Sequence, residues 1–183
     1  MIQTVNFVPG DYYLAVYDYS INDYLRSYFI VVPAGGGGGG SFSIGVSPAL
    51  ASGVIWTSVS PGTSDNPADG NNGNGITSYY VAISTSGKTR VDLYTKGSGD
   101  LIYLTNSIPL ANERFNYNQL DNTVPGITRY SLTTNYADNK IGTNLRNNDR
   151  VNLKFYLNVP NAQAPGSYTN QIEFKGVLAG TAP

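Results

Sequence analysis

The stretch of the sequence richest in oxygen ligands is the loop from Ser64 to Gly75, which carries Asp65, Asp69 and Asn71. Carboxylate, amide and backbone carbonyl oxygens are the ligands that Ca²⁺ prefers in proteins, so these three residues are the candidate calcium ligands. Their spacing does not follow the EF-hand pattern, because Tyr80 stands where that pattern, counted from Asp69, needs a glutamate. The alternative interpretation is a surface loop rich in Gly and Asn between two strands. We favour the loop, and expect no metal and no cofactor.

Catalytic chemistry finds little support in the sequence. The chain has no His and no Cys, which excludes a Ser-His-Asp triad, a cysteine nucleophile and a typical zinc site. Glycoside hydrolysis needs two carboxylates across a cleft, but the glutamates are only Glu113 and Glu173, and the aspartates lie mostly in predicted turns. No pair stands out. The sequence therefore predicts no catalytic residue and a protein that is not an enzyme.

Lysine and tyrosine side chains could supply two further chemistries, an isopeptide bond and stacking on sugars. An intramolecular Lys–Asn isopeptide bond needs a buried lysine beside an acid, whereas the strand pattern places Lys154 and Lys175 on outward faces, so we expect no such bond. Tyrosines at Tyr79-Tyr80 and Tyr117 could stack on sugars or fill an interface, or could instead cover the edges and core of the fold. Trp56 follows two apolar residues and is predicted to lie in the core.

The composition is that of an all-β protein of one medium domain. In 183 residues there are 21 Gly and 15 Tyr, and Tyr favours strands whereas Gly favours turns. Charged residues make up 13%, against about 25% in an average soluble domain, and the net charge is −1. The charges form no basic stripe, which argues against nucleic acid as a partner. No apolar run is long enough to predict a membrane span.

Apolar and polar residues alternate without a break from Arg150 to Val159, and this period of two predicts a half-buried strand that ends at Pro160. A turn at Pro165-Gly166 leads into a second alternating run, Ser167–Val177. Two strands joined by a short loop predict an antiparallel pair. Further strands are expected at residues 42–46, 53–59, 77–84, 89–95, 100–104 and 127–133, with a helical turn near residues 110–113. The predicted fold is an immunoglobulin-like or jelly-roll-like antiparallel β-sandwich with an N-terminal β extension.

The sequence divides into an extension (residues 1–34), a linker of six glycines (35–40) and the sandwich (41–183). In the extension, the run Tyr28–Val32 is apolar on both faces, and such a strand must be covered from two sides. It therefore docks either on the rest of the chain or on another copy. The first residues lack the features of an export signal. Either the protein is cytoplasmic or such a signal is missing from this sequence. Low charge with abundant Tyr, Asn, Ser and Thr is common in extracellular proteins, so we favour the second alternative.

Three segments, Val54–Thr63, Lys88–Tyr94 and Val159–Tyr168, resemble Ig-like domains of prokaryotic, especially archaeal, surface proteins. Similar domains occur in proteins associated with S-layers and in archaeal pili and threads. In those filaments a subunit lacks one strand, and the N-terminal strand of a neighbour fills the gap, an arrangement called donor-strand complementation. This chain departs from the simplest such pattern, because its extension is predicted to hold three strands and a glycine run separates it from the body.

The resemblance implies an extracellular structural subunit that assembles with copies of itself into a cell-surface filament or layer. The exchanged strand is expected to come from the extension, where the candidate interface residues are Val5, Phe7, Tyr28, Phe29, Ile30, Val31 and Val32. The alternative is that these strands complete the sheets of their own chain. A second hypothesis for function is a carbohydrate-binding or adhesive module of a larger secreted protein, with surface glycans as partners.

Overall fold

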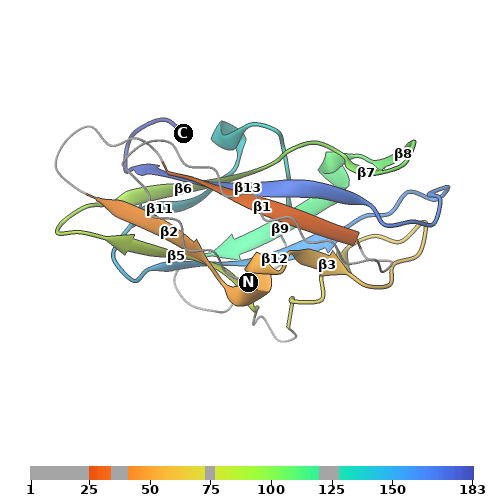
Figure 1. The fold of residues 1–183 in the computed structure, drawn as a ribbon, viewed down its shortest axis with the longest axis horizontal. Helices are drawn as coiled ribbons and strands as arrows, with labels where there is room; N and C mark the ends of the chain where they lie inside the picture. The colour runs from red at the N-terminus through yellow and green to blue at the C-terminus, as the bar shows by residue number, and fades with distance from the viewer. Residues whose placement is uncertain (1–24, 34–40, 73–76, 120–127) are drawn as a thin grey trace, which may run out of the picture.

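The computed structural model of the chain describes residues 41–72, 77–119 and 128–183, together with the backbone of residues 25–33. In this part of the chain, two mostly antiparallel β-sheets pack face to face (Figure 1). The all-β sandwich expected from the sequence is confirmed. The interface candidates Val5 and Phe7, the other strands expected before residue 25 and the glycine linker lie outside the described residues.

Sheet A has seven strands within the described residues, in the order β11–β6–β13–β1–β3, and the β7–β8 hairpin joins it through β13. In sequence order its strands are β1 (Leu25–Pro33), β3 (Val54–Trp56), β6 (Val91–Gly97), β7 (Leu101–Tyr103), β8 (Asn106–Ile108), β11 (Lys140–Leu145) and β13 (Thr169–Leu178). The strand predicted from the apolar run Tyr28–Val32 is therefore present, as β1.

Sheet B has six strands within the same residues, in the order β10–β9–β12–β5–β2, and β4 also pairs with β12. Its strands are β2 (Phe42–Val46), β4 (Asn66–Pro67), β5 (Tyr79–Thr85), β9 (Glu113–Asn118), β10 (Tyr130–Ser131) and β12 (Arg150–Leu157). The sequence patterns predicted β2, β5 and β12 closely. They missed β4 and β9 in this sheet and β8 and β11 in sheet A.

Among the described residues, three short helical segments connect the strands. α1 (Pro48–Ala51) begins at Ser47, whose hydroxyl accepts a hydrogen bond from the Leu50 N–H (3.2 Å), and Pro48 fits the first turn because its missing N–H would have no helical partner there. The 3₁₀ turns are η1 (Leu110–Asn112), which was expected, and η2 (Tyr136–Asp138). No helix of the described residues has the length and hydrophobicity needed to cross a membrane.

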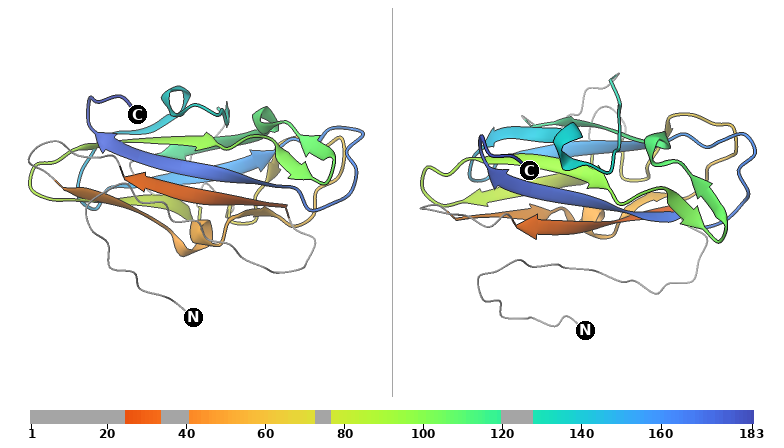
Figure 2. Two further views of the ribbon diagram at one scale, coloured as in Figure 1. Left: turned by 45° about the horizontal axis from the view of Figure 1, so that its top comes forward. Right: turned by 90° about the horizontal axis from the view of Figure 1, so that it is seen from above.

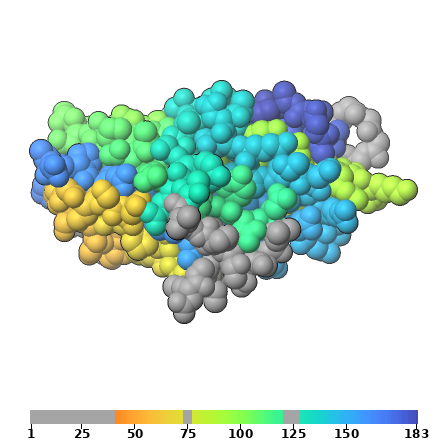
Figure 3. Space-filling view, turned by 180° about the vertical axis from the view of Figure 1, so that it is seen from behind, coloured from red at the N-terminus to blue at the C-terminus, as the bar shows by residue number. Residues whose placement is uncertain are grey.

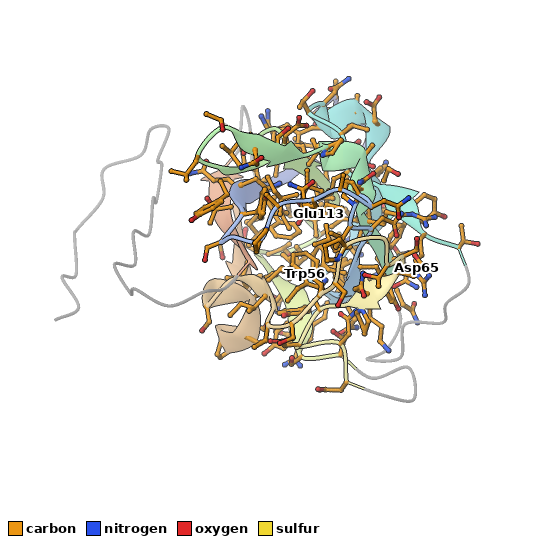
Figure 4. All side chains as sticks on the ribbon, turned by 90° about the vertical axis from the view of Figure 1, so that its right-hand side faces the viewer. Trp56, Asp65 and Glu113 are labelled. Carbon is orange, nitrogen blue, oxygen red and sulfur yellow. The ribbon has the colours of Figure 1, made fainter. Side chains whose placement is uncertain are left out.

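The core lies between the sheets, where the inward-facing residues of neighbouring strands meet. Burying each large apolar side chain contributes about 1.5–3 kcal/mol, so this layer is the main source of stability. Trp56 is 1% exposed, as expected, and Figure 4 places it in the interior of the fold. The fully buried side chains of β12 and β13 are Val151, Leu153, Phe155, Leu157, Ile172 and Phe174.

Two expectations about β12 are wrong. It does not pair with β13, because β12 belongs to sheet B and β13 to sheet A. After β12 the chain is held by the loop around Gly62: the Val159 N–H donates to the Thr63 carbonyl (2.8 Å), and the Gly62 N–H donates to the Val159 carbonyl (3.0 Å). This connection carries the chain across to the other sheet. The second error concerns Lys154, which was expected on a solvent-facing surface but is only 7% exposed.

Candidate functional site

β1 occupies a position in sheet A that joins two otherwise separate strands. It pairs with β13 over eight register positions, from Arg26 opposite Thr169 to Pro33 opposite Gly176. On its other side it pairs with β3 over three positions, from Leu25 opposite Trp56 to Ser27 opposite Val54. In the described part of sheet A, β13 and β3 are connected only through β1. Without β1, the body of the sandwich has an open slot between them.

The direction of β1 sets it apart. Its pairing with β13 is parallel, whereas every other strand pair of the described residues is antiparallel. Figure 2 shows the arrows of β1 and β13 side by side and pointing the same way. A parallel neighbour cannot come from a tight hairpin and needs a long connection. β1 is thus a strand that a distant part of the chain brings into the sheet.

A second unusual feature lies on the outer face of sheet B. Lys154 of β12 and Asn116 of β9 stand opposite each other in the antiparallel ladder, so both project to that face. The Lys154 ammonium donates a hydrogen bond to the Asn72 carbonyl (3.0 Å), and burial lowers its pKa. Asn116 is 2% exposed, and in the part of the chain that the structure describes neither its amide nitrogen nor its amide oxygen has a hydrogen-bond partner. Buried polar groups are normally hydrogen-bonded, so Asn116 requires an explanation.

Two arginines extend this face towards β10. Arg129 precedes Tyr130, which pairs with Phe115, so Arg129 lies beside Asn116. Its guanidinium stacks on the Tyr156 ring, 3.8 Å from guanidinium carbon to ring centroid, and its buried Nε has no partner. Asp65 binds the Nη1 atom of Arg129 and also that of Arg114, the latter at 3.2 Å from Oδ1.

We call Arg114, Asn116, Arg129 and Lys154, with Asp65, the basic cluster. Its three cationic side chains face one carboxylate, a formal excess of two positive charges. Figure 3 views the molecule from behind, where the loop that carries Asp65 (orange to yellow) lies close to the segment that follows residue 128 (teal). Figure 4 places Asp65 at the outer side of the fold, away from Trp56 and Glu113.

A polar pair also crosses the interior between the sheets. Glu113 of β9 is 0% exposed, and its carboxylate accepts a hydrogen bond from the side chain of Asn170 of β13 (2.7 Å). The same Asn170 amide donates to the Gly99 carbonyl (3.1 Å). This pair ties the two sheets together rather than lining a cleft.

The three calcium candidates are each engaged by a different partner. Asp65 binds the two arginines, Asp69 accepts hydrogen bonds from the Thr57 backbone and hydroxyl, and the Asn71 side chain bonds to the backbone of Phe155. No group of three acidic side chains that could hold a metal ion occurs among the residues that the structure describes. The structure therefore gives these oxygens structural partners in their own chain.

The tyrosines proposed to stack on sugars fall into two groups. Tyr79 is 2% exposed and packs edge-on against Phe155 at a centroid distance of 5.6 Å, so it belongs to the core. Tyr80 lies on the outer face under the Arg150 guanidinium. Tyr117 packs against Tyr130, with centroids 5.7 Å apart, and Tyr130 is 46% exposed.

Comparison of the chain with protein-family models, with curated proteins and with solved structures returns no match. Function is therefore inferred from the arrangement of residues. Sequence reasoning found β1 but missed the basic cluster. One signal in the sequence could have indicated that the polar face of β12 is covered. A solvated strand face normally carries several charges, but from Asn152 to Asn158 this face carries only one, on Lys154.

Proposed function

We propose that this chain is an extracellular structural subunit that assembles with copies of itself into a cell-surface filament or layer, with β1 exchanged between neighbours. The observation that carries the proposal is the position of β1, which alone closes the slot between β13 and β3 in the described part of sheet A. Its parallel direction and its remote place in the sequence fit a strand that another molecule could supply equally well.

The slot is expected to be unstable when empty. A backbone hydrogen bond contributes about 0.5–1.5 kcal/mol net, so losing the ladder with β13 would cost several kcal/mol. Without β1, the edge of β13 would also expose unpaired backbone N–H and C=O groups. That part of β13 carries Ile172 and Phe174, whose side chains are fully buried in the core. Some strand must therefore fill the slot, and an identical β1 from a neighbour makes the same contacts.

The choice between the chain's own β1 and a neighbour's β1 depends on the linker and on concentration. A strand tethered to its own slot acts at an effective concentration of about millimolar if the linker can span the distance. The sequence between β1 and β2 includes the six glycines Gly35–Gly40, which leave the backbone few restrictions and so permit either path. If each subunit inserts its β1 into the next subunit and accepts β1 from the previous one, the contacts do not form a closed ring, and a filament grows.

Cysteine cross-linking tests the exchange directly, because the chain has no cysteine of its own. Tyr28 stands opposite Gln171 in the β1–β13 ladder, so the double variant Tyr28→Cys/Gln171→Cys should form a disulfide across it. Ser43 and Ser84 stand opposite each other in β2 and β5 and make the matched control, because both belong to the body of one chain.

Assembled material is first identified by electron microscopy and light scattering, and is then oxidised and run on a non-reducing gel. Strand exchange predicts a ladder of covalent multimers from the 28/171 pair and only cross-linked monomer from the control. Cross-linked monomer from the 28/171 pair in assembled material would refute exchange through β1. A chain that stays monomeric at every concentration would refute self-assembly itself.

A second function, glycan binding, is favoured by the Tyr117–Tyr130 pair, because Tyr130 presents an exposed aromatic ring next to another. Glycan-array binding that is saturable and is lost in Tyr130→Ala would support it. Binding that survives this substitution would remove the pair from consideration.

A further inference from the structure

Three groups of the basic cluster have hydrogen-bonding capacity that nothing in the structure uses. Both amide atoms of Asn116 and the Nε of Arg129 are buried and have no hydrogen-bond partner among the described residues. Within the described residues, the Lys154 ammonium donates to a neutral carbonyl, that of Asn72, and forms no ion pair with a carboxylate. Leaving a buried donor unsatisfied destabilises the fold, and the penalty is larger for a charged group. A face built only for stability would carry apolar residues at these positions.

The three residues are neighbours on one face of sheet B. Asn116 stands opposite Lys154 on one side and lies beside Arg129 on the other, so the three form a row across β12, β9 and the start of β10. Tyr156, two residues after Lys154 and on the same face, holds the Arg129 guanidinium by stacking. In this row the Asn116 amide lies between two cationic residues, Lys154 and Arg129.

The unused groups are mostly donors. Lys154 has two N–H groups beyond the one bonded to the Asn72 carbonyl, Asn116 has two, and the Nε–H of Arg129 adds one more. Tyr156 covers one face of the Arg129 guanidinium. The N–H groups of a guanidinium lie in its plane, so a ligand that accepts hydrogen bonds from them approaches along the edge. A planar group with two oxygens and a negative charge matches that edge, and a carboxylate is such a group.

We infer that the outer face of sheet B holds a binding site for a carboxylate, formed by Lys154, Asn116 and Arg129. The entrance lies at the Asp65 end of the cluster, where the side chains of Asp65 and Arg114 are 40% and 30% exposed. Arg129, at 21%, comes next, and Asn116 and Lys154 lie deeper. The bound carboxylate would supply the negative charge that the cluster lacks.

Acetate is the probe, and thermal unfolding is the assay. The melting temperature is measured in rising sodium acetate against sodium chloride of equal ionic strength, and a calorimetric titration gives the dissociation constant. A ligand that binds only the folded state raises the melting temperature in a saturable way. Lys154→Met should weaken acetate binding at least about tenfold. Lys140→Met, which removes a lysine from sheet A, should leave it unchanged.

Asn116→Asp is the second variant, since it adds a carboxylate at the centre of the row with almost no change in shape. It should raise the melting temperature in chloride and abolish the response to acetate. Wild-type protein that shows no acetate-specific, saturable effect would overturn the inference. So would an Asn116→Asp variant that melts lower than wild type and still responds to acetate, or a Lys154→Met variant that binds acetate as tightly as wild type.

The carboxylate could belong to a free acid or to a side chain of another copy, and light scattering in acetate separates these sources. A free acid leaves the mass of any assembly unchanged, whereas a neighbour's carboxylate would be competed away and the mass would fall. Because Tyr28→Cys/Gln171→Cys cross-linking reports on sheet A alone, failure of the carboxylate site and failure of strand exchange give different results.

Discussion

Replacing Asp92 by asparagine is expected to lower the free energy of unfolding by about 2–3 kcal/mol. Asp92 lies on β6, is 2% exposed, and accepts three hydrogen bonds. The donors are the Lys140 ammonium (2.7 Å), the Asn144 N–H (2.9 Å) and the Gly180 N–H (3.1 Å). Asn144 and Gly180 both have positive φ, at 59° and 85°, so this carboxylate holds two left-handed turns in place.

The magnitude follows from what asparagine cannot do. Its amide group keeps one acceptor for Asn144 but places N–H donors where Lys140 and Gly180 also donate. Breaking a buried ion pair costs about 3–5 kcal/mol. The Lys140 side chain is 37% exposed and can return to water, which reduces the loss to the lower range given above.

The pH dependence of the unfolding free energy tests the Asp92–Lys140 interaction in a second way. Burial on its own would raise the pKa of Asp92, but the hydrogen bonds from Lys140, Asn144 and Gly180 outweigh it and hold the pKa below its ordinary value. The stability that Asp92 contributes is therefore complete above its unfolded pKa of about 3.9, and is lost as the pH falls through the lower folded pKa. The Asp92 hydrogen bond raises the pKa of Lys140, so that contribution is lost only as the pH rises through the raised value.

Urea unfolding at pH 7 and at pH 2–3 measures the stability lost in Asp92→Asn and the dependence of that loss on acid pH. The gap between wild type and Asp92→Asn should be largest near neutral pH and should shrink in acid. Asp138→Asn, at an exposed position, is the matched control and should change the unfolding free energy by less than about 0.5 kcal/mol. Equal denaturant midpoints for wild type and Asp92→Asn, or a gap that persists unchanged in acid, would show that the carboxylate does not organise these turns.

Three further outcomes are expected. The melting temperature should be the same with Ca²⁺ and with a chelator, because Asp65 and Asp69 already bind Arg129 and Thr57; a rise with Ca²⁺ would contradict this. Intact mass should equal the sequence mass, with no loss of ammonia from a Lys154–Asn116 bond, since the structure places a carbonyl rather than a carboxyl group at the Lys154 ammonium. Gly62→Ala should lower stability by about 1–3 kcal/mol in urea titration, because φ is +77° there and a Cβ would lie 2.6 Å from the Asn161 Oδ1.

Period-two alternation predicted the strands that line the core. In the two alternating runs, Arg150–Val159 and Ser167–Val177, the apolar residues Val151, Leu153, Ile172 and Phe174 are all 1% exposed or less. The alternation also told the two faces of β12 apart correctly. It could not tell whether the polar face meets water, because the cover comes from distant segments such as the loop that ends at Asn72.

The missed strands have weak patterns for identifiable reasons. β9 buries two polar residues, Glu113 between the sheets and Asn116 on the outer face of sheet B. An alternation rule does not assign polar residues to buried positions. β11 contains Gly142 and the left-handed Asn144, and its register with β6 shifts twice. The predicted pairing of β12 with β13 failed because an eleven-residue connection is compatible with a hairpin and with a crossing between sheets. Contacts of that connection with the Gly62 loop decide between them.

The fold departs from ordinary sequence rules at two places, and these are on opposite sheets. Sheet A is completed by a parallel strand from far along the chain, and sheet B buries a lysine that has no ion-pair partner and an amide that has no hydrogen-bond partner among the described residues. Natural sequences agree with their folds at most positions, and the exceptions gather at functional sites. If each exception serves a separate function, Lys154→Met should leave the cross-linking of Tyr28→Cys/Gln171→Cys unchanged. A substitution in sheet B that also abolished strand exchange would instead mean that the two features form one interface.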